Sequence, residues 1–96
     1  MKVYVVVLEH EHGTDIQAFL KEKDAEYAVL EICADTKEIA SAVEDDQDGK
    51  DALKRLIRLV ADDKVKEAVN MYNAIYYTWF NGDEMHRLFV REVKIK

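Results

Sequence analysis

The chain has 96 residues, of which 49% are hydrophobic and 35% are charged, and its formal net charge is −6 at pH 7. This length fits a single domain over residues 1–96, and the apolar content excludes a disordered chain. The longest apolar run, 3–8, is far shorter than the roughly 20 residues of a membrane span. The acidic balance argues against direct binding to nucleic acid, because phosphate contacts need a surplus of lysine and arginine. We therefore expect a small domain that contacts neither membrane nor nucleic acid.

Two further features predict the compartment. Cys33 is the single cysteine, so an internal disulfide is excluded and the fold does not depend on an oxidising environment. The apolar run that follows Met1 and Lys2 has no cleavage-site pattern behind it, so we expect no signal peptide. Both observations lead us to expect a cytoplasmic protein.

The N-terminal segment predicts a β-hairpin. Residues 2–9 are rich in β-branched side chains, and residues 15–21 alternate with a period of two. Gly13 and Thr14 between them predict a two-residue type II′ turn, because a glycine accepts positive φ at its first central position. This register predicts the pairs Leu8–Phe19, His10–Gln17 and His12–Asp15.

The two faces of this hairpin differ in polarity. One face is wholly apolar and is predicted to be the core: Val3, Val5, Val7, Ile16, Ala18 and Leu20. The other carries Tyr4, Val6, Leu8 and Phe19, with polar residues near the tip. This second set is too apolar for a solvated face, so either helices cover both sides or another chain buries it. A domain of this size struggles to fill two cores, so we predict a partner surface there, with a homodimer expected.

Helical periodicity follows the hairpin. Apolar residues recur at helical spacing, which predicts two to four helices over about 23–44, 51–61 and 63–79. Asp35 or Thr36 would either end the first helix or cap a continuation. The last helix has a rival interpretation, because aromatic residues flank Asn81-Gly82, a typical hairpin turn. We prefer the helix because its apolar stripe stays in phase.

A final strand over about 86–95 completes the predicted fold. The first strand is the most apolar and should be central, so the last strand should pair beside it. The predicted class is α+β, with a small antiparallel sheet and no linker or repeat.

The hairpin tip is a candidate metal site. His10 and His12 lie two apart on a predicted strand and project from one face, and Asp15 joins them across the turn. Two imidazoles and a carboxylate would bind zinc with one position open, and His86 would join only if the last strand brings it near. The alternative is a solvated tip in which His12 and Asp15 form a polar cross-strand pair.

An acidic segment lies near the middle of the chain. Its spacing fails as a calcium loop, because Arg55 falls where a bidentate Glu is required when Gly49 takes the glycine position. We interpret it as solvated acid near a helix start. Its carboxylates are candidate partner-binding residues: Glu44, Asp45, Asp46 and Asp48.

The chain resembles small uncharacterised proteins of phage and plasmid type. The resemblance rests on the H-x-H-G-x-D hairpin of "VYVVVLEHEHGTDIQAFLKEKDAEYAVLEI" and on the tail "AVNMYNAIYYTWFNGDEMHRLFVREVKI", together about half of the chain. It implies no activity. It does imply a mobile-element context, in which small acidic proteins act as inhibitors of host nucleic-acid machinery.

Three functions are therefore considered. No glycine-rich phosphate loop or nucleophile motif is present, and Cys33 lies on an apolar helical stripe, so we expect a non-enzymatic protein. The leading hypothesis is a protein-interaction role with self-association through the mixed sheet face. The alternatives are a zinc-binding module at the hairpin and an acidic inhibitor that imitates nucleic acid with its clustered carboxylates.

Overall fold

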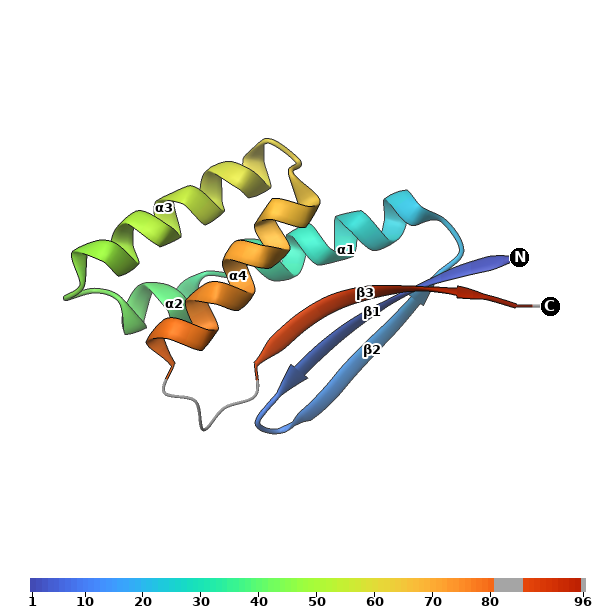
Figure 1. The fold of residues 1–96 in the computed structure, drawn as a ribbon, viewed down its shortest axis with the longest axis horizontal. Coiled ribbons are helices and arrows are strands. Elements are labelled where there is room, and N and C mark those ends of the chain that lie inside the picture. Colours follow the sequence, from blue (N-terminus) through green and yellow to red (C-terminus); the bar gives the residue numbers. More distant parts are fainter. Residues whose placement is uncertain (81–85, 96) are drawn as a thin grey trace.

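The computed structural model describes residues 1–80 and 86–95. Its elements, in chain order, are β1 (Lys2–His10), β2 (Gly13–Phe19), α1 (Glu22–Ala34), α2 (Lys37–Ala42), α3 (Gln47–Ala61), α4 (Val65–Trp79) and β3 (Arg87–Lys94). The strands form an antiparallel sheet of order β2-β1-β3 (Figure 1). The predicted α+β class, the N-terminal hairpin and the last strand beside the first are confirmed.

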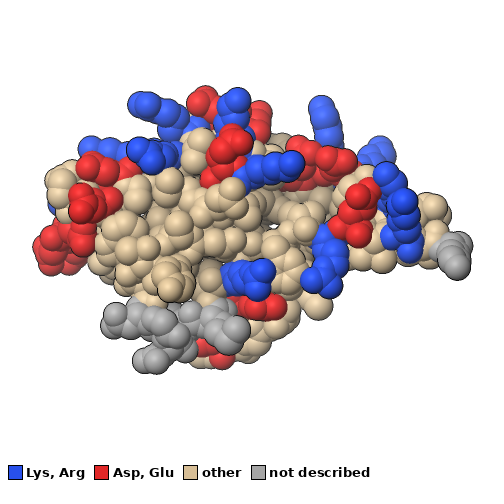
Figure 2. All heavy atoms as spheres, viewed as in Figure 1, with Lys and Arg blue, Asp and Glu red and all other residues tan. Residues whose placement is uncertain are grey.

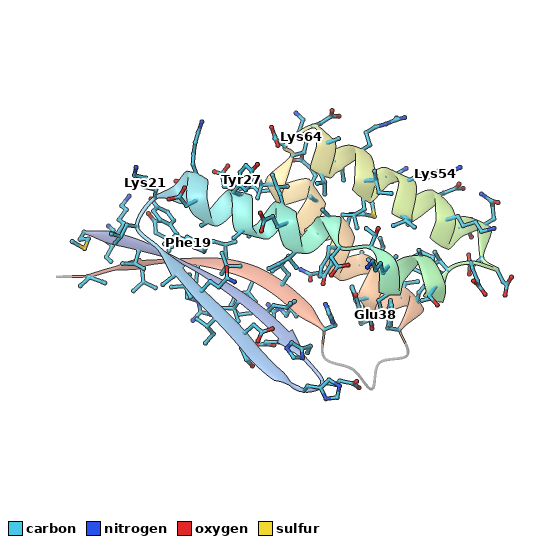
Figure 3. The ribbon with its side chains drawn as sticks, turned by 180° about the vertical axis from the view of Figure 1, so that it is seen from behind. Phe19, Lys21, Tyr27, Glu38, Lys54 and Lys64 are labelled. Carbon is cyan, nitrogen blue, oxygen red and sulfur yellow. The ribbon has the colours of Figure 1, made fainter. Side chains whose placement is uncertain are left out.

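The helices all lie on one side of the sheet (Figure 1). Helix α1 contacts all three strands, α4 contacts α1 and β3, and α3 packs on α1 and α4. The fold is therefore a helical layer over one sheet face, and the same one-sided arrangement is seen from behind, where side chains also project from the uncovered face (Figure 3). Met1 and Ile95 are hydrogen-bonded through their backbones, so β1 and β3 also end side by side.

The hairpin turn differs from the prediction. Glu11 and His12 form the two-residue connection between His10 and Gly13, which are paired, and Gly13 opens β2 with a φ of 136°. Positive φ is where a glycine is favoured, so the glycine has the expected backbone role one place later in the turn. The Gly13-Thr14 loop and its register were therefore wrong. The observed register pairs Val5 with Ala18 and Val7 with Ile16 on one face, and Tyr4 with Phe19 and Leu8 with Asp15 on the other.

The assignment of the two sheet faces was also wrong. Val6 is 1% exposed in the core, and the other members of the predicted partner surface, Tyr4, Leu8 and Phe19, pack against the core under the helices. The face predicted as core is the uncovered one, where Ile16 is 64% exposed. Tyr4, Leu8 and Phe19 of the mixed face pack against the same core as the small buried residues of α1, which include Ala25 and Cys33.

The helix boundaries refine the predictions. The stretch 23–44 is divided: α1 ends at Ala34 with Asp35 as its C-cap, and Thr36 is the N-cap of α2, so the first helix ends here and a second one continues. Helix α4 confirms the helical interpretation of 63–79 over the rival hairpin, whose Asn81-Gly82 lies outside the described residues. In the described ranges, none of the helices has the length and apolarity required to cross a membrane.

The core lies between the helical layer and the sheet. Its largest fully buried side chains include Ile39, Leu56, Ile75 and Leu88, drawn from α2, α3, α4 and β3. Cys33 is fully buried among them, as its place on the apolar stripe predicted. Burial raises the pKa of its thiol to about 12, so the thiol stays protonated and unreactive at neutral pH.

Candidate functional site

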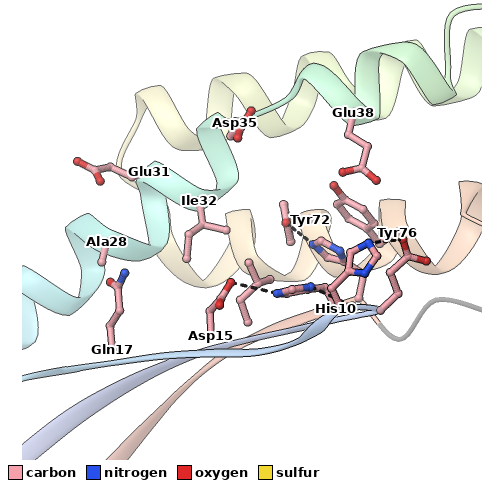
Figure 4. A pocket seen from close by; sticks show the side chains of 14 residues that line it. His10, Asp15, Gln17, Ala28, Glu31, Ile32, Asp35, Glu38, Tyr72 and Tyr76 are labelled. Carbon is pink, nitrogen blue, oxygen red and sulfur yellow. Dashed lines mark hydrogen bonds and ion pairs between the residues drawn. The ribbon is translucent and has the colours of Figure 1, made fainter.

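A cleft of about 600 Å³ opens between the tip of the hairpin and the ends of α1 and α2 (Figure 4). Helix α4 and the start of β3 form its floor. The residues that line it are Leu8, His10, Glu11, His12, Asp15, Gln17, Ala28, Glu31, Ile32, Asp35, Glu38, Tyr72, Tyr76 and His86. The cleft therefore gathers all three histidines of the chain.

The hairpin side of the cleft is built around His10. Its Nε2 lies 3.1 Å from Oδ2 of Asp15, and its Nδ1 accepts a hydrogen bond from the backbone N–H of His12. The His12 ring turns instead toward Glu11, with Nε2 3.0 Å from Oε1, and its side chain is 81% exposed. The polar cross-strand pair at the tip is thus His10 with Asp15, rather than the predicted His12 with Asp15.

The predicted zinc ligands are not assembled into a site. His12 falls in the turn because of the shifted register, so it does not project from the strand beside His10, and their ring centroids lie 6.3 Å apart at an angle of 63°. Across residues 1–80 and 86–95, no group of three His, Cys, Asp or Glu side chains is placed to hold a metal ion. The described geometry therefore gives the zinc hypothesis no ligand set.

The floor of the cleft is an aromatic stack around His86. Its ring lies on Tyr76, with centroids 3.6 Å apart and planes within 6°, and its Nε2 is hydrogen-bonded to the Tyr72 hydroxyl. The two tyrosines are one helical turn apart on α4 and are both buried. Burial strongly raises the pKa of Tyr72, so its hydroxyl keeps its proton and we assign it as the donor to His86.

The helical side of the cleft carries three acidic residues. Glu31 lies on α1, Asp35 in the connection and Glu38 on α2, opposite the hairpin (Figure 4). In the part of the chain that the structure describes, none of the three forms an ion pair. Together with Glu11 and Asp15 they give the cleft five acidic residues and no lysine or arginine among the residues that the structure describes. A hollow lined by one sign of charge concentrates ions of the opposite sign.

His86 makes the stability of the fold sensitive to pH. Burial, followed by the charge of nearby His10, lowers the pKa of His86 below its ordinary value of 6.5. The unfolded chain then takes up this proton before the folded chain does, so stability is fully present above about pH 6.5 and is lost as the pH falls through the lower, folded value. We expect the melting temperature of the wild type to be lower at pH 5.5 than at pH 7.5, and this difference to be smaller in the His86→Gln variant. Calorimetry at the two pH values measures this difference, and His12→Gln, which also removes one histidine, is the control and should behave like the wild type. The same change of melting temperature with pH in the wild type and in His86→Gln would contradict the prediction.

The acidic segment lies at the opposite end of the helical layer from the hairpin, where acidic side chains gather over the connection between α2 and α3 (Figure 2). Asp46 caps α3, accepting hydrogen bonds from the Gly49 N–H at 2.9 Å and from Nε1 of Trp79 at 3.0 Å. These bonds lower the pKa of Asp46. Glu44, Asp45 and Asp48 are exposed, and none of the four lines the cleft. The structure confirms acid near a helix start, and it gives Asp46 a role within the fold.

Most of the cleft was not predicted. Sequence spacing found His10 and Asp15, and it named His86 as a residue that the last strand would have to bring near. Tyr72 and Tyr76 were visible only as part of an apolar helical stripe. Glu31, Asp35 and Glu38 had no local signal, because exposed acids on helices usually face solvent.

Comparisons with known proteins found no family model, curated protein or solved structure that matches the chain. The resemblance to phage- and plasmid-type proteins stays a prediction.

Proposed function

We propose that the protein is an interaction protein whose cleft binds lysine or arginine side chains of a protein partner. The observation that supports this is the lining of the cleft, where the described residues include five acids, three of them outside any ion pair, and no lysine or arginine. A partner of this chemistry is also what the acidic-inhibitor hypothesis requires, because nucleic-acid-binding surfaces are rich in lysine and arginine.

The arrangement of the cleft favours an organic cation over a metal ion. The His10 ring already contacts Asp15 and the His12 backbone, and His86 is hydrogen-bonded to Tyr72, so ring nitrogens are engaged. Carboxylates are left as the recognition groups, and a guanidinium or ammonium pairs with them through charged hydrogen bonds. The volume of about 600 Å³ lies in the usual range for ligand sites and accommodates long side chains.

Calorimetric titration with peptides tests this proposal. We expect a peptide containing several arginines to bind. The same peptide with neutral citrulline in place of arginine should bind at least about tenfold more weakly, because it cannot form ion pairs with the carboxylates of the cleft. The double variant Glu31→Gln/Glu38→Gln should show the same loss. The matched control, Glu44→Gln/Asp45→Asn, removes equal charge from the other acidic segment and should bind like wild type.

The contradicting outcomes are distinct. Equal loss in both double variants would mean that net charge, and not the cleft, attracts the peptide. If free arginine binds as tightly as the peptide, the cleft is a site for a small molecule, and the proposal that its ligand is a protein is wrong. Binding of citrulline and arginine peptides with equal affinity would overturn the proposal altogether.

A further inference from the structure

The uncovered side of the sheet is apolar over most of its extent. We call it the open sheet face and define it by the side chains that project away from the helices: Val3, Val5, Val7, Ile16, Ala18, Phe89 and Val93, with Leu20 and Ile95 at one end. Ile16 is 64% and Leu20 71% exposed. None of these residues packs against the hydrophobic core. Monomeric proteins rarely leave so continuous an apolar surface in water.

The size of the open sheet face fits a protein interface. Strands of nine, seven and eight residues give a flat footprint on the order of 400 Å². The accessible surface of the face is larger than this footprint, because its side chains project and because Leu20 and Ile95 extend it at one end. It therefore approaches the roughly 800 Å² of accessible surface that each partner contributes to a standard interface. None of the four described helices covers this side of the sheet (Figures 1 and 3).

The occupant is identified by the composition of the face. Phe89 is its single aromatic ring and is flanked by the guanidinium groups of Arg87 and Arg91 at 5.2 and 5.6 Å. Single-stranded nucleic acid is bound on sheets by several stacking rings, which this face lacks. Its β-branched aliphatic side chains instead suit the packing of one sheet on another. We propose that a second copy of this chain covers the open sheet face, as a two-fold symmetric pair of stacked sheets.

The charges on the face select the orientation of the pair. A two-fold axis across the strands would stack β3 on β3 and bring the arginines of both copies together, which is unfavourable. An axis along β1 places the β3 of one copy over the β2 of the other. The strand registers put Phe89 and Ile16 in one row across the sheet, and Arg91 and Ala18 in the next. Phe89 of each copy then lies over Ile16 of the other, and each arginine over a small neutral residue.

Sedimentation or light scattering of matched variants tests the pair. We expect a dimer for the wild type at micromolar concentrations, and for Ile16→Lys a dimer dissociation constant raised at least about tenfold, because the lysine replaces an apolar contact at the interface. The same substitution at Ile57, which is 51% exposed on α3, is the control and should leave the dimer intact. A wild type that stays monomeric at high concentration, or an Ile16→Lys variant that dimerises normally, would overturn the proposal.

Cysteine cross-linking tests the orientation. Facing residues of stacked sheets lie about 10 Å apart, so a short bifunctional maleimide should link Ile16→Cys protein to Phe89→Cys protein, and native Cys33 should not compete because it is buried. Cross-linking of Ile16→Cys only with itself would place β2 of one copy against β2 of the other, by stacking or at the edge, and would overturn the proposed orientation. These measurements use no peptide, and the cleft lies on the helix-covered side, so their failure is separate from failure of the proposed function.

Discussion

Replacing Asn73 by alanine should lower the free energy of unfolding by about 3 kcal/mol, because two partly buried backbone groups would lose their partners. The Asn73 side chain lies on α4 and bonds twice to Leu88 of β3. Its Nδ2 donates to the Leu88 carbonyl and its Oδ1 accepts from the Leu88 N–H, each at 2.8 Å. The amide therefore pairs with the edge of β3 as another strand would, and it fixes the strand to the helical layer.

Chemical denaturation measures this loss, and the chain offers a close control. Asn70 is the same residue type one turn earlier on α4 and is exposed. Asn70→Ala should change stability by no more than about 0.5 kcal/mol, as for most surface substitutions. Similar values for the two variants would contradict the bridging role of Asn73.

Gly49→Ala should destabilise the fold by about 2 kcal/mol, although alanine ordinarily favours a helix over glycine by about 1 kcal/mol. Gly49 lies in the first turn of α3 and is buried. An added Cβ would lie 2.6 Å from both Cβ and Cγ1 of Val43, closer than two non-bonded carbon atoms can approach each other. Either α3 must move away from the end of α2, or Val43 must shift within the core.

A double-mutant cycle separates this overlap from other effects. In a Val43→Gly background the overlapping atoms are absent, so the further change Gly49→Ala should cost at least about 1 kcal/mol less than it does alone. The denaturant midpoint gives all four values. A Gly49→Ala protein as stable as the wild type would show that the contact is loose.

The identity of each element followed from local patterns. The stripe that runs from Val65 to Trp79 stays in phase, so it predicted a helix against a competing Asn-Gly turn. Strand β1 was placed centrally because it is apolar on both faces. These predictions succeeded because the period of burial is imposed on each segment by its own backbone geometry.

The register, the faces and the cleft did not follow from local patterns. The position of Gly13 was correctly linked to positive φ, but a glycine beside a turn fits several registers, and both the predicted and the observed register give Val7 an apolar partner. Which face is covered depends on the fit between Tyr4 or Leu8 and α1, and spacing along one segment carries no information on that fit. Glu38 and His86 meet in one cleft only through tertiary packing.

The bond between the amino group of Met1 and the carbonyl of Ile95 joins residues 94 positions apart. During synthesis, β1 therefore emerges long before β3, its second neighbour in the sheet, which follows more than 75 residues later. Until β3 arrives, one side of this apolar strand keeps free N–H and C=O groups, a state in which nascent chains pair wrongly with one another. Strand β3, the last of the three strands along the sequence, covers this side of β1 and completes the sheet.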